Sequence, residues 1–360
     1  MDEPTVQIAG RTIARDGPPF VIAEIGVNHD GQMSIAGRLI DAAAEARADA
    51  VKFQLFSARL LLAREAALVD YQKSSAPSAA ALLTPLELTP EQIAALIAHA
   101  HDRGLAALVT PFSVPLVPAA ARAGADALKI ASPDLVNRPL VEAAVATDLP
   151  LVVSTGAAWL DEIAQTLSWL GPARRRTILL HCVSSYPTPE DGATLAAIRV
   201  MRTEWPDLAV GYSDHTTHTI TGGLAVSSGA VVLEKHLTLD RARRGPDHAA
   251  SLDPADFARY VELARTAHRM RGPFAKAVLD IEQSVREQTR QSVALAVDVP
   301  RGVALRAEHL TVMRPGTGIP AAGLADVVGR WTVRALKAHT LLQLADLGDP
   351  ENLAPEAQPG

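Results

Sequence analysis

The stretch Val231-Val-Leu-Glu-Lys-His-Leu-Thr-Leu-Asp240 has the pattern of a buried β-strand that ends in polar residues. Side chains alternate along a strand, so Glu234 and His236 share one face while the preceding apolar side chains are buried. An earlier apolar run, Leu208-Ala-Val-Gly-Tyr212, ends in the same way in Ser213-Asp-His-Thr216. Two histidines at the ends of successive strands predict a metal site.

Similar apolar runs alternate with Ala- and Leu-rich segments of helical periodicity from Phe20 to Leu237, a pattern typical of repeated β-α units. Eight runs can be identified, at residues 21–26, 50–56, 106–111, 127–132, 151–156, 177–183, 209–214 and 231–237. Eight such units predict an α/β fold, a (β/α)8 TIM barrel, which binds ligands at the carboxyl ends of its strands.

Nearly every predicted strand carries polar side chains at that end. They are Glu24, Lys52, Gln54, Thr110, Lys129, Ser132, Ser154, Thr155, His181, Ser184, Ser213, His215, Glu234 and His236. A charged residue in an apolar strand is costly to bury unless it is paired or bound to a ligand. This regular placement predicts a functional site at one end of the barrel.

The rest of the chain supports the predicted alternation of strands and helices and adds a second domain. Thr89-Pro-Glu-Gln92 and Asp253-Pro-Ala-Asp256 carry helix N-cap signals. The long insertion at 58–87, which contains Tyr71-Gln-Lys-Ser-Ser-Ala-Pro77, predicts a substrate lid. A charged helical stretch is expected near 265–290, and short β-type runs follow it. We expect a barrel domain at 1–270, a linker at 271–290, a small β-rich domain at 291–349 and a disordered tail at 350–360.

Composition narrows the class of protein. Hydrophobic residues make up 48% of the chain but aromatic residues only 4%, so the core must be built from Ala, Val, Leu and Ile. The formal net charge of -6 argues against a nucleic-acid partner. The single cysteine, Cys182, excludes an internal disulfide and fits a reducing compartment. Without a signal sequence or a long apolar run, we expect a cytoplasmic protein with no membrane partner.

The strand-end residues suit an anionic substrate and a divalent cation. Lysines neutralise phosphate and carboxylate groups, and hydroxyls donate directed hydrogen bonds. Two histidines with oxygen ligands suit Mn²⁺ or Mg²⁺ at least as well as Zn²⁺. Structural roles are the alternative: lysines paired with neighbouring carboxylates, histidines hydrogen-bonded in the core and Cys182 buried. His29, His181, His218 and His248 are further candidate ligands, and Glu24, Asp134, Glu234 and Asp247 are candidate acids, bases or sugar-hydroxyl acceptors.

The chain resembles the N-acetylneuraminate (sialic acid) synthase family of nonulosonic acid synthases. The resemblance spans nearly the whole chain and rests on eight ordered motifs. These are Ala23-Glu-Ile-Gly-Val-Asn-His-Asp-Gly31, Ala50-Val-Lys-Phe-Gln54, Thr110-Pro-Phe-Ser113, Lys129-Ile-Ala-Ser132, Ser154-Thr-Gly156, His181-Cys with Tyr186-Pro-Thr-Pro189, Gly211-Tyr-Ser-Asp-His-Thr216 and Glu234-Lys-His236 through Gly245-Pro-Asp247. The C-terminal part is similar to the antifreeze-like (SAF) domain of these enzymes.

This resemblance implies condensation of phosphoenolpyruvate with the open-chain aldehyde of an N-acyl hexosamine, giving a nine-carbon 2-keto acid and phosphate. It also implies a domain-swapped homodimer in which the SAF domain completes the partner's site. It assigns catalytic roles to Glu24, Asp134 and Glu234, phosphoenolpyruvate binding to Lys52, Thr110, Lys129, Ser132, Ser154, Ser184 and Ser213, sugar binding to Gln54, Tyr186, Asp247 and Arg314, and a Mn²⁺ or Mg²⁺ ion to His215 and His236.

The sequence departs from the family pattern in three places. The usual Ser-Gly-Glu is here Ser132-Pro-Asp134, which shortens the carboxylate by one methylene. Ser184 stands where some members have Asn, and Ala157 stands where Met is common.

Three other functions are considered beside the N-acetylneuraminate synthase. One is a legionaminic or pseudaminic acid synthase that acts on a diacetamido-trideoxyhexose. A second is a 3-deoxy-octulosonate or heptulosonate phosphate synthase, although those lack the C-terminal domain. The third is a non-catalytic carbohydrate-binding barrel, which would need neither the lysines nor the histidines.

Overall fold

A computed structural model describes residues 5–64, 66–68 and 77–349 of the chain. The chain divides into two compact units, Met1–Pro273 and Phe274–Gly360. Each unit has a hydrophobic core of its own. The predicted disordered tail at 350–360 lies outside the described residues, as do positions 65 and 69–76 of the predicted lid.

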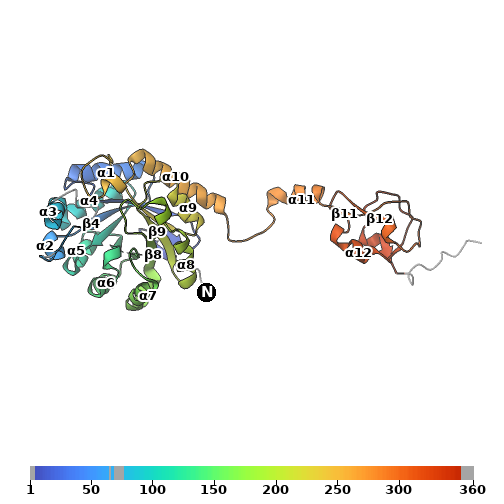
Figure 1. Cartoon of the computed structure of the whole chain (residues 1–360), viewed down its shortest axis with the longest axis horizontal. Helices are drawn as coiled ribbons and strands as arrows, with labels where there is room; N and C mark the ends of the chain where they lie inside the picture. Colours follow the sequence, from blue (N-terminus) through green and yellow to red (C-terminus); the bar gives the residue numbers. More distant parts are fainter. Residues whose placement is uncertain (1–4, 65, 69–76, 350–360) are drawn as a thin grey trace, which may run out of the picture. The chain divides into compact units, whose positions relative to one another are not determined.

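The first unit is a closed barrel of eight parallel strands, which confirms the predicted fold (Figure 1). In order around the barrel after β10 come β3 to β9. The strands are β3 (Phe20–Gly26), β4 (Ala50–Leu55), β5 (Ala106–Pro111), β6 (Ala127–Ile130), β7 (Leu151–Ser154), β8 (Thr177–Cys182), β9 (Ala209–Asp214) and β10 (Val232–His236). Five predicted strands end one or two residues early, because their last residues, such as Ser132 after β6 and Thr155 after β7, already belong to the βα loops.

Helices surround the barrel, and the two at residues 90–102 and 254–271 begin where the N-cap signals predict. The helices are α1 (Met33–Glu45), α2 (Ala58–Leu61), α3 (Ala79–Leu83), α4 (Pro90–Asp102), α5 (Val117–Arg122), α6 (Arg138–Val145), α7 (Leu160–Trp169), α8 (Ala196–Glu204), α9 (Thr221–Ser227) and α10 (Pro254–Arg271). Thr89 and Gln92 form a reciprocal capping box on α4. The Asp253 side chain accepts a hydrogen bond of 3.0 Å from the Asp256 N–H at the start of α10.

A hairpin that the sequence patterns did not reveal closes the amino-terminal end of the barrel. Its strands are β1 (Thr5–Ile8) and β2 (Arg11–Ala14), which pair antiparallel. Val6, Ile8 and Ile13 pack into one apolar cluster with residues from the beginnings of the barrel strands. Burial of these side chains leaves the carboxyl ends of the strands as the end at which a ligand can enter.

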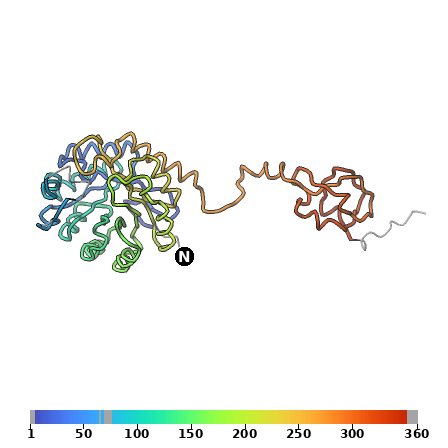
Figure 2. Tube along the Cα trace, in the orientation of Figure 1, coloured from blue at the N-terminus to red at the C-terminus, as the bar shows by residue number. Residues whose placement is uncertain are grey.

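The second unit is small and β-rich, as predicted. Its elements are α11 (Gln283–Thr289), β11 (Ser292–Leu295), β12 (Leu310–Met313), α12 (Leu324–Val327), β13 (Trp331–Thr332) and β14 (Leu347–Gly348). β11 pairs with β12 and β13 pairs with β14, both antiparallel, and irregular loops connect them (Figure 2). Val293, Leu295 and Leu342 belong to its core.

The helical stretch expected near 265–290 is interrupted. α10 ends at Arg271, and Gly272 adopts the left-handed region with φ of 62°. Pro273 follows, and the next α-helix begins only at Gln283. Because glycine tolerates a positive φ and proline cannot donate a helical hydrogen bond, this pair separates the two helical segments.

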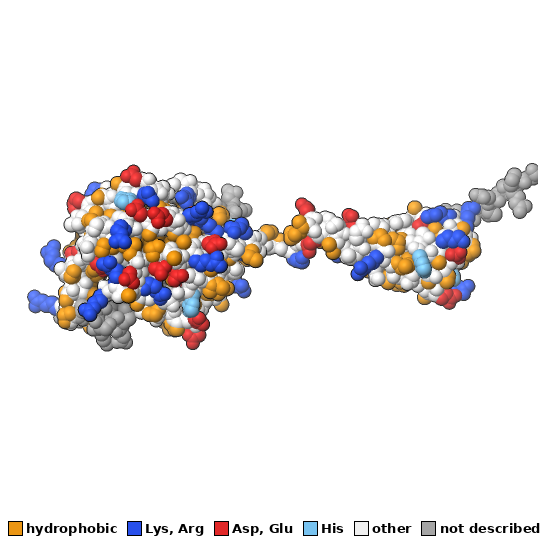
Figure 3. Space-filling view, turned by 90° about the horizontal axis from the view of Figure 1, so that it is seen from above, with side chains coloured by type: hydrophobic (Ala, Val, Ile, Leu, Met, Phe, Trp, Pro, Cys, Tyr) orange, Lys and Arg blue, Asp and Glu red, His pale blue; other side chains and the backbone are white. Residues whose placement is uncertain are grey.

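Charge is distributed over the barrel surface. On the face visible in Figure 3, basic and acidic side chains are interspersed over the barrel unit. Among the described helices, none is both long enough and apolar enough to cross a membrane.

Candidate active site

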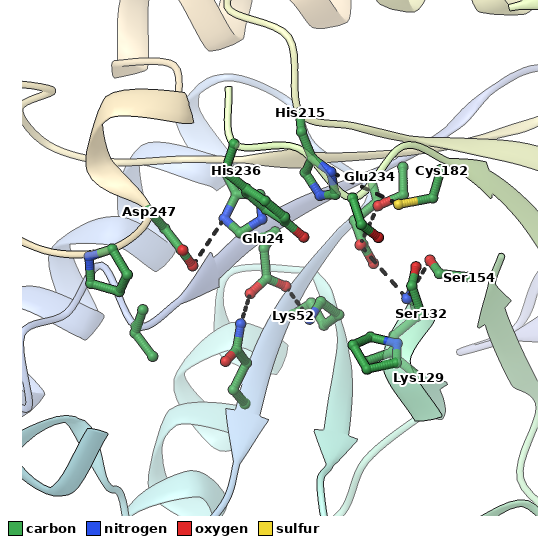
Figure 4. A pocket seen from close by; sticks show the side chains of 18 of the residues that line it. Glu24, Lys52, Lys129, Ser132, Ser154, Cys182, His215, Glu234, His236 and Asp247 are labelled. Carbon is green, nitrogen blue, oxygen red and sulfur yellow. Dashed lines mark hydrogen bonds and ion pairs between the residues drawn. The ribbon is translucent and has the colours of Figure 1, made fainter. Parts of the chain in front are cut away.

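A cavity of about 690 Å³ lies at the carboxyl ends of the barrel strands. The predicted site residues that line it are Glu24, Lys52, Gln54, Lys129, Ser132, Ser154, Ser184, Tyr186, Ser213, His215, Glu234, His236 and Asp247. Figure 4 shows many of these side chains converging from different strands. The alternation of each strand therefore brings together residues that are far apart in the sequence.

Two buried lysines define one part of the cavity. Lys129 Nζ donates to Ser154 Oγ at 2.6 Å and lies 3.8 Å from Glu234 Oε1. Lys52 Nζ forms an ion pair with Glu24 Oε2 and donates to Thr110 Oγ1 at 3.0 Å. Both lysines thus have carboxylate partners, as the alternative structural role for these lysines predicts. Both nevertheless line the cavity and can face an anion there.

Glu234 lies between the lysines and the histidines. Its Oε1 accepts a hydrogen bond of 2.9 Å from Ser213 Oγ. Burial acts to raise the pKa of Glu234, but Lys129, Lys52 and the Ser213 hydroxyl outweigh burial and lower the pKa below its usual value. Glu234 is therefore ionised at neutral pH, with Oε2 buried and without a hydrogen-bond partner among the described residues.

The two predicted metal-binding histidines are neighbours across the cavity. Their ring centroids are 5.5 Å apart, and the ring centroids of Tyr186 and His215 are 3.9 Å apart. His215 Nδ1 is 2.8 Å from the Val183 carbonyl, which can only accept, so this nitrogen carries a proton, and Nε2 is the nitrogen that can offer a lone pair when the ring is neutral. Burial acts to lower the pKa of His215, but Cys182 and the Val183 carbonyl raise it above its usual value.

His236 is the less satisfied of the pair. Its Nδ1 is buried, makes no hydrogen bond with the described residues and lies 3.6 Å from Asp247 Oδ2. Burial, together with the positive charges of His215 and Lys52, holds the pKa of His236 well below its usual value. Its imidazole is therefore neutral, as a metal ligand must be. Within the described chain, no cluster of three or more His, Cys, Asp or Glu side chains is arranged to hold a metal ion.

The other candidate histidines have partners elsewhere and do not line the cavity. His29 Nδ1 accepts from the Gly31 N–H at 2.9 Å, and His181 Nε2 lies 3.1 Å from the Ala193 carbonyl. His218 pairs with Glu190, and His248 lies 3.0 Å from Asp30 Oδ1. These contacts favour His215 and His236 as the pair that faces a ligand.

Asp247 is held in place by its loop. Its carbonyl accepts from Ser251 Oγ at 2.7 Å, and Ser251 in turn accepts from Asn28 Nδ2 at 2.8 Å. Burial raises the pKa of Asp247, although His215 and Lys52 oppose the increase. Its carboxylate lies beside His236 in the cavity (Figure 4).

Three predicted residues are not among those that line the cavity. Thr110 is fully buried and supports Lys52. Asp134 accepts a hydrogen bond of 3.0 Å from Asn137 Nδ2, and its neighbour Pro133 lines the cavity instead. Arg314 belongs to the second unit. The roles assigned to these three residues stay predictions, as do the roles of the residues that line the cavity.

Sequence reasoning missed an apolar part of the cavity wall. Its members are Val27, Phe56, Leu61, Leu83 and Phe112. Phe56 and Phe112 directly follow strands β4 and β5 and pack edge to face with ring centroids 6.2 Å apart. Their position after strand ends was a usable signal, whereas Leu61 and Leu83 come from the insertion and carry no motif. Cys182 also lines the cavity, with Sγ 3.8 Å from His215 Nδ1.

Comparison with known proteins gives consistent matches over both units. The NeuB family model matches residues 39–276, and the SAF domain model matches residues 290–348. The chain is 36% identical to the N,N'-diacetyllegionaminic acid synthase of Legionella pneumophila, over 90% of this chain and 93% of that protein. It is 31% identical to the N-acetylneuraminate-9-phosphate synthase of Mus musculus, over 89% of this chain and 90% of that protein.

A solved structure extends the likeness to three dimensions. The N-acetylneuraminic acid synthetase of Leptospira borgpetersenii, in complex with citrate, is 32% identical and superposes with a TM-score of 0.70. The match covers 79% of this chain and 95% of that one. The cavity at the end of the barrel, the ordered motifs and these matches lead to one conclusion: the chain belongs to the NeuB family.

Proposed function

We propose that this protein is a phosphoenolpyruvate-dependent nonulosonic acid synthase. It would join phosphoenolpyruvate to the open-chain aldehyde of an N-acyl hexosamine and release phosphate and a nine-carbon 2-keto acid. The observation that carries the proposal is a single cavity in which Lys52 and Lys129, with nearby hydroxyls, lie opposite His215, His236 and Asp247. Anion-binding groups and electrophile-binding groups are both needed for this condensation.

Phosphoenolpyruvate would occupy the part of the cavity that contains the lysines. Lys129 supplies a positive charge that the Ser154 hydroxyl already orients. Lys52 supplies a second, buried between Glu24 and Thr110. Ser132, Ser184 and Ser213 add further hydroxyls to the lining of the same cavity. Charge-assisted hydrogen bonds of this kind fix a phosphate and a carboxylate in one orientation.

The aldehyde would meet the imidazoles. His236, whose Nδ1 makes no hydrogen bond with the described residues, and His215, whose Nε2 can offer a lone pair, fit a divalent cation, because their ring centroids are 5.5 Å apart and both rings line the cavity. His215 and His236 would hold Mn²⁺ or Mg²⁺, which supplies Lewis-acid polarisation of the aldehyde oxygen. Gln54, Tyr186 and Asp247 would orient the sugar chain, and Glu24, hydrogen-bonded to Gln54 Nε2 at 3.0 Å, would accept from a sugar hydroxyl.

The chemical step balances without a redox partner. C3 of phosphoenolpyruvate forms a bond to the aldehyde carbon, whose oxygen takes up a proton and becomes a hydroxyl. Water adds at C2 and gives up a proton, for which the ionised Glu234 is the proposed acceptor, with Asp134 as the second carboxylate. The C2–O bond to phosphate then breaks, leaving the 2-keto acid and inorganic phosphate. We assign the protein on this basis to the transferases.

The apolar wall favours one acceptor class over another. Val27, Phe56, Leu61, Leu83 and Phe112 offer contact to methyl groups, and Lys52 and Lys129 are the only lysine or arginine side chains among the described residues that line the cavity. A 2,4-diacetamido-trideoxyhexose carries one ring methyl and two acetamido methyls, whereas a sugar 6-phosphate would need a further cation. We therefore favour the diacetamido-trideoxyhexose, the substrate of a legionaminic- or pseudaminic-type synthase, over N-acetylmannosamine and its 6-phosphate.

The decisive assay is phosphate release from phosphoenolpyruvate with each of these three sugars, with the nine-carbon acid identified by mass spectrometry. We expect the highest kcat/KM with the diacetamido-trideoxyhexose, by at least about tenfold, since each apolar methyl contact contributes roughly 1 kcal/mol or more. Lys129→Met should abolish release with every sugar. Absence of release with all three sugars would contradict the synthase, while a preference for the 6-phosphate would contradict only the acceptor assignment.

The assembly and location complete the proposal. The SAF domain match at residues 290–348 supports a homodimer in which Arg314 reaches the partner's cavity. The same match separates this chain from the octulosonate and heptulosonate phosphate synthases that lack such a domain. We propose a cytoplasmic enzyme, since phosphoenolpyruvate is a cytoplasmic metabolite.

A further inference from the structure

A fully buried ion pair lies directly behind the two cavity histidines. Asp214 precedes His215 and Lys235 precedes His236, and both charged side chains are 0% exposed. Lys235 Nζ lies 3.3 Å from Asp214 Oδ1. Neither residue lines the cavity, so the reaction described above uses neither of them.

The strand register explains why the pair faces away from the substrate. β9 and β10 run parallel with Glu234 opposite Ser213 and Lys235 opposite Asp214. Because successive side chains alternate, Ser213, His215, Glu234 and His236 face the cavity while Asp214 and Lys235 face the surrounding helices. There Lys235 Nζ lies 5.7 Å from the centre of the Tyr260 ring of α10.

The pair also holds the chain immediately after His215. The Thr216 N–H donates to Asp214 Oδ1 at 2.8 Å, and the Thr216 carbonyl accepts from Lys235 Nζ. Thr216 is 1% exposed, so its backbone groups need partners within the protein. Two apolar residues of the same size would fill the space but would leave both backbone groups without partners.

Burying the Asp214–Lys235 ion pair costs free energy that apolar side chains at the same two positions would not cost. Burying two charges demands desolvation of both, and apolar substitutes for a buried pair often stabilise a fold as well or better. We therefore attribute the two charges to the position of the backbone at Thr216, whose N–H and carbonyl they bind. The group they place most directly is His215, whose backbone lies between Asp214 and Thr216, and the second is His236, which follows Lys235.

We propose that Asp214 and Lys235 form a positioning pair that sets the separation of His215 and His236 for one divalent cation. The inference rests on the proposed function, because it assumes that the two imidazoles share a metal ion. Asp214 and Lys235 touch neither substrate nor metal. Their effect is on how well the histidines are arranged before the ion arrives.

The test is Mn²⁺ binding to the full-length protein, followed through the electron paramagnetic resonance signal of free Mn²⁺. Asp214→Asn with Lys235→Met removes both charges while Asn can still accept from the Thr216 N–H. We expect the Mn²⁺ dissociation constant to rise at least about tenfold, the range found for residues that orient metal ligands. At saturating Mn²⁺, kcat should stay within about threefold of the wild-type value, because the loss lies in affinity.

A more exposed ion pair at the other end of the barrel serves as control. Arg11 forms an ion pair with Asp49, whose Oδ2 accepts from the Val21 N–H at 2.8 Å. Arg11→Met with Asp49→Asn should leave Mn²⁺ affinity within about twofold of wild type. Asp214→Asn alone, which keeps Lys235, should give an intermediate loss and provides a second variant if the double variant does not fold.

The outcomes separate the two claims. Mn²⁺ affinity of a folded Asp214 or Asp214/Lys235 variant within twofold of the wild-type value overturns the positioning role. An equal loss in the Arg11/Asp49 control also overturns it, since general destabilisation then explains the effect. Failure of the wild-type protein to bind Mn²⁺ at all overturns the metal site itself, and with it the positioning pair.

Discussion

At the scale of single residues, the site depends on charged groups that burial alone would neutralise. Lys52 is the clearest case. Burial lowers the pKa of Lys52 to about 8, although Glu234 opposes the shift. Its ammonium group is therefore close to losing its proton near physiological pH. An anionic substrate that contacts Lys52 would favour the protonated form.

We predict that phosphoenolpyruvate binding weakens as the pH rises through about 8, because Lys52 then becomes neutral. Isothermal titration calorimetry from about pH 7 to about pH 9 should show the dissociation constant rising toward the alkaline end. Lys52→Arg retains its charge throughout this range and should remove most of that slope. An equally steep slope in Lys52→Arg would show that another group is responsible.

The lowered pKa of Lys52 affects the free energy of unfolding in the opposite direction. In the unfolded chain this lysine has its ordinary pKa of 10.5, so between about pH 8 and pH 10.5 the unfolded state binds more protons than the folded state. The contribution of Lys52 to the free energy of unfolding therefore rises with pH in this window. Substrate affinity and the stability contribution of this residue respond to pH in opposite directions.

At the scale of elements, the barrel is built from strands that local sequence specifies well. Each predicted strand is an apolar run with a polar carboxyl end, and each βα unit returns the chain to the same layer. Helix starts are equally local, since Thr89 and Gln92 satisfy the first free backbone donors of α4 through a reciprocal pair of hydrogen bonds.

Thr89→Ala should lower the free energy of unfolding of the barrel unit by about 1 kcal/mol, because α4 loses its N-cap acceptor. Thr89→Ser keeps the hydroxyl and should be nearly neutral. Urea denaturation of both variants checks the prediction. Since Thr89 is not among the residues that line the cavity, KM for phosphoenolpyruvate should not change, and a change would place α4 in the binding site.

The features that sequence reasoning missed depend on tertiary context. The hairpin of β1 and β2 has strands of only four residues each, and what stabilises it is packing against the barrel core. Gly272, with φ of 62°, ends α10 before the charged residues that the sequence pattern predicts to be helical. Leu61 and Leu83 reach the cavity from an insertion whose course no motif predicts. The strand-end residues were predictable because alternation and barrel closure determine where they lie.

At the scale of the whole molecule, the assignment of Arg314 requires the second unit of one protomer to complete the cavity of another. Arg314→Ala and Lys52→Ala should each be inactive, but a mixed dimer would contain one site with both wild-type residues. Random mixing should therefore restore about a quarter of the wild-type activity, as expected for a twofold-symmetric exchange.

The measurement is phosphate release after the two inactive proteins are unfolded and refolded together. Each variant refolded alone provides the baseline. No recovery in a sample that contains heterodimers would place Arg314 and Lys52 in the site of the same chain, or would exclude Arg314 from the site.

The central claim is that carbon–carbon bond formation is coupled to cleavage of the C–O bond of phosphoenolpyruvate. The most direct test is turnover in ¹⁸O-labelled water with the preferred sugar, followed by mass spectrometry of both products. We expect a nine-carbon 2-keto acid and an equal amount of phosphate without ¹⁸O, because water attacks C2. Phosphate that carries ¹⁸O, or phosphate release without the nine-carbon acid, would contradict it.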